Sequence, residues 1–248
     1  MKTRKLFLTL TLIGALLFVT NGTAQEEPTR NMVEITYIRA KMGHEADFIA
    51  AVKAHNDAFH NEIPYTGNLD LIQTGRESGW FVNIMGPCNF SDLDNRPSSD
   101  AHNSDWEDNV GQHVARFGRT EYWSINSNLS NPIMAIEDIK YETIWFIKMN
   151  RDNPNADADF AKFMKMALEV NKKHESDHRV YYSMFAGDDG RDLAVVFPHK
   201  ALGDLDSDRN FGKEFDAIHG EGSFEKALKL WSGAIKSVNQ QLWQIGVN

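Results

Sequence analysis

The chain has 248 residues, of which 42% are hydrophobic and 25% charged, and its formal net charge is −9. This balance is typical of a soluble globular protein, and 15 Phe, 6 Trp and 6 Tyr exclude disorder for the bulk of the chain. The acidic balance argues against nucleic acids and anionic membrane surfaces as partners, since both require clustered Lys and Arg. The single cysteine, Cys88, excludes a disulfide scaffold and is expected to be a buried, small apolar side chain.

The N-terminus has the pattern of a secretory signal peptide over residues 1–24. Three basic residues within 2–5 precede an apolar run over 6–19, and small residues over 22–24 provide a cleavage site. The run is shorter than the ~20 residues that a membrane-spanning helix needs. We therefore expect an exported chain, periplasmic or extracellular, with no membrane attachment after cleavage.

The rest of the chain repeats itself. The segment at 75–85 resembles the one at 187–197, and the Asp-Leu-Asp of 92–94 recurs at 204–206. Self-similarity at a fixed spacing indicates a duplicated structural unit. We expect a first repeat over 32–126, a linker over 127–140 and a second repeat over 141–248.

Hydrophobic periodicity predicts the elements of the first repeat, with alternation indicating strands and spacings of three and four indicating helices. The expected order is a strand at 33–39, a helix at 44–60, a hairpin of strands at 68–74 and 80–85, a second helix with apolar residues from 106 to 117, and a strand at 119–126. A long polar loop at 86–104 precedes the second helix, and loops of this length are often lids.

The second repeat shows the same order of patterns. We expect a strand at 142–149, a helix at 156–173, hairpin strands at 179–186 and 193–198, helices at 207–219 and 223–238, and a strand at 241–247. The order βαββαβ is the ferredoxin-like motif of the α+β class, in which helices cover one face of a four-stranded antiparallel sheet. Two such sheets that pack their open faces together predict a closed or nearly closed eight-stranded barrel inside a helical coat.

This element order and duplication resemble the dimeric α+β barrel superfamily in a fused, tandem form. That superfamily includes NIPSNAP-like, EthD-like and antibiotic-biosynthesis-monooxygenase (ABM)-like domains, as well as the haem-binding chlorite dismutases. The resemblance covers residues 32–247 and carries no catalytic motif, so it implies the fold much more than the function. It also implies a ligand cavity between the two sheets.

Strand alternation selects the candidate residues of that cavity. If Ile35 and Tyr37 face the helices, Glu34 faces the interior, and Asp70 does so from the second strand. A carboxylate in an apolar cavity has a raised pKa and is suited to general acid–base catalysis. The expected aromatic walls are Trp145, Tyr182, Trp123 and Trp243, with Trp80 and Trp106 at the cavity mouth. The alternative is that both acids are solvated at the barrel ends.

Histidines give no metal motif in the sequence. His55 and His60 are five residues apart, which predicts different helix faces and a poor metal pair. Neither a Cys/His cluster nor an HExxH motif occurs, and the acidic run at 204–208 lacks the glycine and glutamate of a calcium loop. We therefore expect no metal and no tightly bound cofactor. His113, on an apolar helix stripe, is a core histidine or a third catalytic candidate.

Three functions remain open from the sequence. In the first, the barrel binds or transforms a small, often aromatic molecule between its sheets. In the second, it is a non-enzymatic exported binding or interaction protein with a packed barrel. A distant third is a haem-binding barrel, for which only His113 and His219 lie on suitable elements. The expected partners are a small molecule and no nucleic acid, and the chain is a monomer or a homodimer.

Overall fold

The computed structural model describes residues 29–187 and 189–248, so the predicted signal peptide lies outside the described residues. Fourteen principal helices and strands are found there. In chain order they are β1 (Met32–Ala40), α1 (Glu45–Phe59), β2 (Gly67–Ile72), β3 (Phe81–Cys88), α2 (Phe90–Asp94), α3 (Asp100–Asp105), β4 (Val114–Ile125), β5 (Tyr141–Met149), α4 (Ala156–Lys173), β6 (Arg179–Ser183), β7 (Leu193–His199), α5 (Phe211–His219), α6 (Ser223–Ala234) and β8 (Ile235–Gln244).

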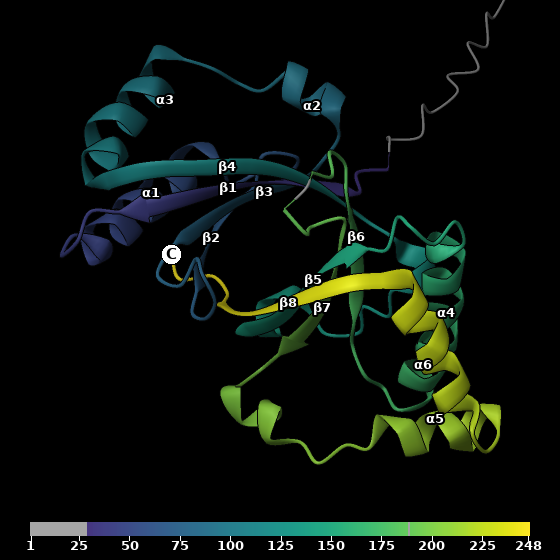
Figure 1. Ribbon diagram of the computed structural model, residues 1–248. Helices are drawn as coiled ribbons and strands as arrows, with labels where there is room; N and C mark the ends of the chain where they lie inside the picture. Colours follow the sequence, from purple (N-terminus) through teal and green to yellow (C-terminus); the bar gives the residue numbers. More distant parts are fainter. Residues whose placement is uncertain (1–28, 188) are drawn as a thin grey trace, which may run out of the picture.

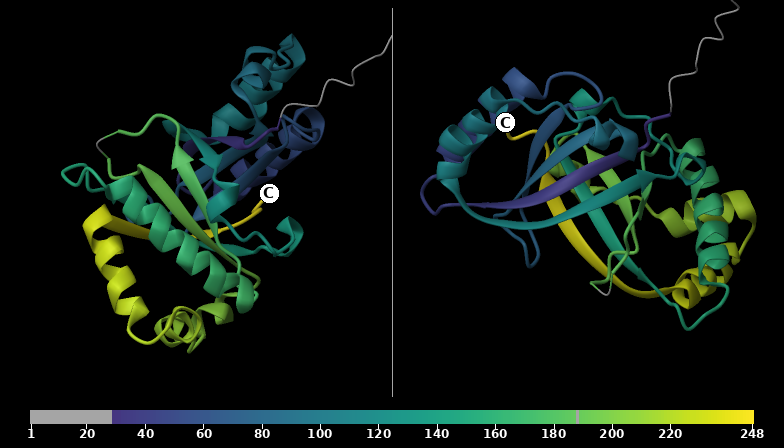
Figure 2. Two further views of the ribbon diagram at one scale, coloured as in Figure 1. Left: turned by 90° about the vertical axis from the view of Figure 1, so that its right-hand side faces the viewer. Right: turned by 90° about the horizontal axis from the view of Figure 1, so that it is seen from above.

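The eight strands form one closed barrel in the order β1-β3-β2-β8-β5-β7-β6-β4. Strands from each half of the chain stay together, and the two halves meet at two antiparallel seams, β2 with β8 and β4 with β6. The β2–β8 seam is short, with only Leu71 opposite Gln244 and Ile72 opposite Trp243. Figures 1 and 2 show α1 and α3 beside the first half of the barrel and α4, α5 and α6 beside the second.

Side chains from both halves fill the barrel interior. Ile35, Ile72 and Trp123 of the first half pack with Phe146 and Trp243 of the second in one buried cluster. The ring of Trp243 lies 6.3 Å from Tyr37 and 6.2 Å from Phe146, centroid to centroid. The barrel interior is therefore a shared hydrophobic core.

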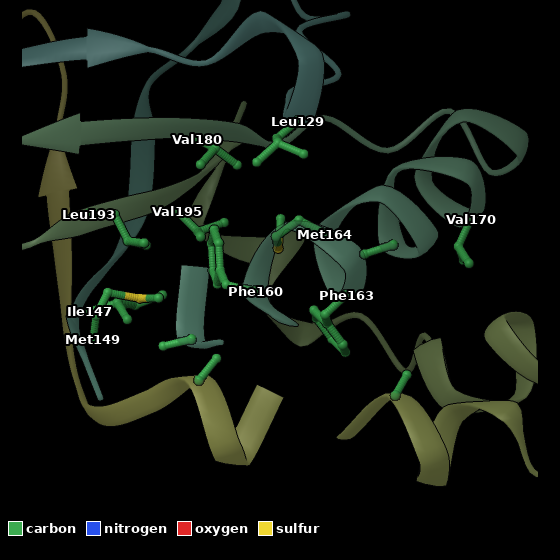
Figure 3. Close-up of a cluster of buried hydrophobic side chains, with 14 of the residues drawn as sticks. Leu129, Ile147, Met149, Phe160, Phe163, Met164, Val170, Val180, Leu193 and Val195 are labelled. Atoms are coloured by element: carbon green, nitrogen blue, oxygen red, sulfur yellow. The ribbon is translucent and has the colours of Figure 1, made fainter. Parts of the chain in front are cut away.

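Two further apolar layers lie outside the barrel, between the strands and the helices. In the first half, Phe48 and Val52 of α1 pack against Ile38, Leu69 and Phe81. In the second half α4 buries residues three and four apart, which places them on one helix face. Figure 3 shows members of this second cluster, among them Ile147, Phe160, Phe163, Met164 and Val195.

Cys88 ends β3 and is fully buried beside Met32 and Met85. This is the environment expected of a small apolar side chain. Across the described ranges 29–187 and 189–248, no helix has the length and hydropathy needed to cross a membrane.

Two predicted helices are shorter than expected, for one physical reason. The segment around 106–117 is helical only to His113, through a π turn and a 3-10 turn, and β4 begins at Val114. Likewise α6 ends at Ala234, and β8 begins at Ile235. Each strand continues along its neighbour, with Val114 opposite Ala40 and Ile235 opposite Met149. Sheet pairing thus overrides the helical spacing of the apolar residues.

The polar segment predicted as a loop at 86–104 is also more ordered than expected. It contains the end of β3, the whole of α2 and most of α3. Asn89 and Asp92 form a capping box at the start of α2, and the Ser99 hydroxyl accepts a hydrogen bond from the His102 backbone N–H at the start of α3.

Candidate functional site

The predicted facing of β1 is wrong. Ile35 and Tyr37 lie in the barrel interior, whereas Glu34 and Thr36 line a cavity on the outer side of the sheet. The strand is buried on both faces, because Ile38 and Ala40 pack under α1 while Ile35 and Tyr37 pack inside. Alternation therefore could not identify the inner face.

The same reversal occurs in the second half. Thr143 and Trp145 line the space under α4 and α6, and Tyr182 packs against the same helical layer. Their neighbours Ile144 and Tyr181 face the barrel interior instead. Of the predicted aromatic walls, Trp123 and Trp243 point into the barrel, where they are 4% and 3% exposed and belong to the packed core.

Asp70 points into the barrel, as predicted, and lies near one end. Its carboxylate accepts a hydrogen bond from the Gly246 backbone N–H at 2.9 Å, and the residue is only 2% exposed. Burial raises the pKa of Asp70 to about 7, and burial together with the neighbouring Asp70 raises the pKa of Glu142 to about 8. Glu142 is a carboxylate that the sequence analysis missed, because the facing of β5 was reversed.

Because the pKa values of Asp70 and Glu142 are raised, we expect the free energy of unfolding to fall as pH rises. An acid with a raised pKa in the folded state keeps a proton that the unfolded chain releases, so folding weakens from about pH 4 to about pH 7 for Asp70. We expect Asp70→Asn to flatten this fall and to raise the free energy of unfolding at pH 8 by roughly 1–3 kcal/mol. The amide oxygen still accepts from Gly246. Urea unfolding between pH 4 and pH 8 measures the effect.

The exposed Asp47 provides the matched control, since 61% of its side chain is exposed. Asp47→Asn should leave in place the fall in stability between pH 4 and pH 8 that Asp70 causes. If the free energy of unfolding of Asp70→Asn varied with pH in parallel with that of the wild type, ionisation of Asp70 would not destabilise the folded state.

The opposite end of the barrel holds a buried ion network. The Arg191 guanidinium donates to the Tyr37 hydroxyl and to Glu121 Oε2, the latter at 3.3 Å, and lies 3.8 Å over the Phe146 ring. Arg119 pairs with Glu121 at 2.9 Å and with Glu77 at 3.2 Å. Burial raises the pKa of Tyr37 well above its usual value, so the hydroxyl stays protonated.

A large cavity lies outside the barrel rather than between the sheets. Its volume is about 710 Å³, and it separates the outer face of β5 and β7 from α4, α5 and α6. Most of the lining is aromatic or aliphatic, from Trp145, Phe163, Phe197, Phe211, Phe224 and Trp231. The size and lining suit a small, mainly apolar ligand.

One wall of this cavity is polar. Arg209 donates to Glu214, Ser176 and Asn171 at 2.6, 2.6 and 3.0 Å, which uses three of the five N–H donors of a guanidinium. His178 accepts from the Asn171 amide at 2.9 Å and donates from Nε2 to the Leu129 carbonyl at 2.8 Å. Arg209 is thus the group best placed to meet a polar atom of a ligand.

The other predicted residues lie elsewhere. Trp80 packs against the barrel core, and Trp106 packs beside α1 in the first half. His113 is the last residue of the 3-10 turn before β4, where its ring is 5.7 Å from that of His44, rather than on the apolar stripe of an α-helix. The predicted catalytic trio Glu34, Asp70 and His113 is therefore spread over three separate places.

The residues do not fit a haem in the large cavity. His178 uses both ring nitrogens in hydrogen bonds, and His199 lies on β7 with Nε2 bonded to Thr143. His219, on α5, donates towards the Met166 carbonyl and does not line the cavity. Within residues 29–187 and 189–248, no helix presents a histidine to this cavity.

Comparisons with known proteins support the fold. No family model matches the chain, and no curated protein matches its sequence. The solved structures of monooxygenase-like proteins from Fusobacterium nucleatum and Lactobacillus acidophilus are each 10% identical, with TM-scores of 0.55 and 0.53. They cover 89% and 88% of this chain, and 94% and 95% of their own chains.

Chlorite dismutase from Candidatus Nitrospira defluvii, in complex with imidazole, is similar as well. It is 11% identical with a TM-score of 0.52, and the match covers 88% of this chain and 92% of that chain. These structures belong to the dimeric α+β barrel superfamily. The chain therefore shares its fold with these structures, and at such low identity the likeness extends to the fold alone.

Proposed function

We propose that the protein binds or transforms a small, mainly apolar, aromatic molecule in the cavity between the second half of the barrel and helices α4–α6. The aromatic lining of a cavity of about 710 Å³ is the observation that carries this proposal. Trp145, Phe163 and Trp231 offer ring faces and edges for stacking. Arg209 on the polar wall suits a carbonyl, hydroxyl or acidic group of the ligand.

The structural neighbours support the same class of activity. Two of them are monooxygenase-like proteins and another is a chlorite dismutase, and these names indicate reactions on small molecules. The location differs from the sequence-based hypothesis, because the space between the sheets is filled by Trp123, Phe146 and Trp243. From the sequence, a packed barrel is the arrangement expected of a non-enzymatic binding protein. The cavity outside the barrel is compatible with binding alone and with binding followed by catalysis.

We also propose that the chain arose by duplication and is exported. The strand orders β4-β1-β3-β2 and β8-β5-β7-β6 are equivalent in the two halves, which supports two ferredoxin-like repeats. The basic and apolar pattern over 1–24 supports export. Since the barrel closes within one chain, a monomer has no open sheet face, and a homodimer would form through other surfaces.

Blocking the cavity tests the proposed function. Ala167 of α4 lines it and is 4% exposed, so Ala167→Phe fills part of the space. With an anilinonaphthalene sulfonate dye as the aromatic probe, we expect binding of one dye per chain and at least a tenfold weaker affinity in the variant. Dye fluorescence titration, with circular dichroism to check folding, measures the change.

The same substitution at Ala158, exposed on the same helix, should leave dye affinity unchanged. Leu228→Trp narrows the cavity at a residue that is 40% exposed and so costs little stability. Equal dye binding by the wild type, Ala167→Phe and Leu228→Trp would contradict the proposed site.

A further inference from the structure

The side chains of three histidines lie close together in the first half of the molecule. None of them lines the aromatic cavity, which is formed by residues of the second half and the linker. His55 lies on α1, His60 follows the last residue of that helix, and His102 lies on α3. One nitrogen from each lies within 4.8 Å of those of the other two. His60 Nε2 and His102 Nε2 are 3.1 Å apart. They line a cavity of about 290 Å³ on the outer side of the sheet.

The other ring nitrogen of each histidine faces an oxygen. His55 Nδ1 donates to Asp105 Oδ2 at 2.7 Å, and His60 Nδ1 donates to the Tyr65 carbonyl at 3.1 Å. A carboxylate and a carbonyl only accept, so in the neutral rings these contacts place the proton on Nδ1 and the lone pair on Nε2. His102 Nδ1 lies 3.1 Å from Asn103 Oδ1, which favours the same tautomer.

His55 shows that the arrangement is incomplete without a ligand. The residue is 1% exposed, and its Nε2 has no hydrogen-bond partner among the described residues. Buried polar atoms are nearly always paired, so one left unpaired calls for an explanation. A hydrogen bond between His60 and His102 alone would leave this nitrogen unpaired, whereas one bound cation would pair with all three.

We propose that His55, His60 and His102 form a site for one divalent first-row transition metal ion. Imidazole nitrogens suit ions such as Zn²⁺ and Co²⁺. Metal–nitrogen bonds of about 2.0–2.1 Å in a tetrahedron place two ligand nitrogens roughly 3.3 Å apart, close to the separation of His60 and His102. Hydrogen bonds from ligating histidines to a carboxylate or a carbonyl are the usual outer shell of such sites.

Three protein ligands leave a position of the ion open towards the cavity. Glu34 lies in this cavity, where Arg96 donates to both carboxylate oxygens at 2.9 Å. Three-histidine sites with an open position bind water or a substrate there. The open position and the exposed guanidinium of Arg96 suit water or a small anion.

A second group, His44, Asp47 and His113, has similar spacing but a different setting. His44 and Asp47 are exposed and already paired at 3.2 Å. This group contains no buried, unpaired nitrogen, and it provides the control for the experiment.

Cobalt titration of the full chain, freed of metal by a chelator and dialysis, tests the proposal. We expect one Co²⁺ per chain with visible d–d absorption, displaced by Zn²⁺. His102→Ala and His60→Gln should each weaken Co²⁺ affinity at least 100-fold. Asp105→Asn, which removes the carboxylate oxygen that accepts from His55 Nδ1, should weaken it about 10- to 100-fold. His113→Ala should bind as the wild type does.

His102 is half-buried on the short helix α3, so its replacement need not unfold the chain, and circular dichroism checks this. Wild-type binding no tighter than that of the His60→Gln/His102→Ala variant would overturn the proposal. So would loss of binding in His113→Ala alone. Neither result bears on dye binding in the aromatic cavity, so the two sites are tested separately.

Discussion

Replacing Arg191 with alanine is expected to lower the free energy of unfolding by about 3–5 kcal/mol. Arg191 is 6% exposed, and it donates to both Tyr37 and Glu121 at one end of the barrel. Removing one partner of a buried ion pair leaves the other charge without compensation. The Glu121 side chain, 12% exposed, then loses one of its two arginine partners and keeps its pair with Arg119 and the hydrogen bond from the Trp123 indole N–H.

Urea unfolding followed by tryptophan fluorescence measures this loss. Arg151→Ala is the matched control, because its ion pair with Asp157 is 60% and 70% exposed, and exposed pairs contribute about 0–1 kcal/mol. Arg191→Ala combined with Glu121→Gln should recover part of the loss, since no unpaired charge remains. If Arg191→Ala lowered the free energy of unfolding no more than Arg151→Ala does, the buried ion network would not stabilise the fold.

The order of elements was predictable because most of them bury one face only. On α4, Phe160, Phe163, Met164 and Ala167 keep helical spacing against a single layer. The facing of β1 and β5 was not predictable, because both strands lie between the barrel core and a helical layer. In such a strand each alternating set combines apolar with polar residues, so the pattern does not show which set faces inward.

The candidate sites could not be predicted from the sequence, because they are formed by contacts that residue spacing along the chain does not reveal. Five residues separate His55 from His60, which would place them on different faces of a continuous helix. However, α1 ends at Phe59, and His60 adopts φ −131° and ψ 44°. Its ring therefore lies 5.2 Å from that of His55, and His102 arrives from a segment predicted as a loop.

The aromatic cavity also combines elements that are distant in the chain. Trp145 comes from β5, Phe163 from α4 and Trp231 from α6. Each was predictable as an apolar residue on its own element, and Trp145 was predicted to line a cavity. Which side of the sheet the cavity occupies depends on how bulky the residues inside the barrel are. Phe146, Trp123 and Trp243 fill the interior, and the free volume lies beyond it.

Trp243→Ala is expected to destabilise both halves of the protein together, by about 3–5 kcal/mol. Trp243 is 3% exposed, contacts Tyr37 and Phe146 from different halves, and pairs across the β2–β8 seam with Ile72. The loss combines the transfer of a large aromatic side chain with the cavity left behind. Its indole N–H also loses the 2.8 Å hydrogen bond to Gln241 Oε1.

Because the barrel core is shared, the loss should move one cooperative unfolding transition rather than split it. Hydrogen exchange of amides in β3, in the first half, and in β7, in the second, measures the two halves separately in the same sample. We expect both sets of amides to lose protection by the same free energy. Phe185→Ala, at a side chain that is 71% exposed, should change neither set by more than about 0.5 kcal/mol. Loss of protection in β7 alone would mean that the halves fold independently and that the seams only join two finished sheets.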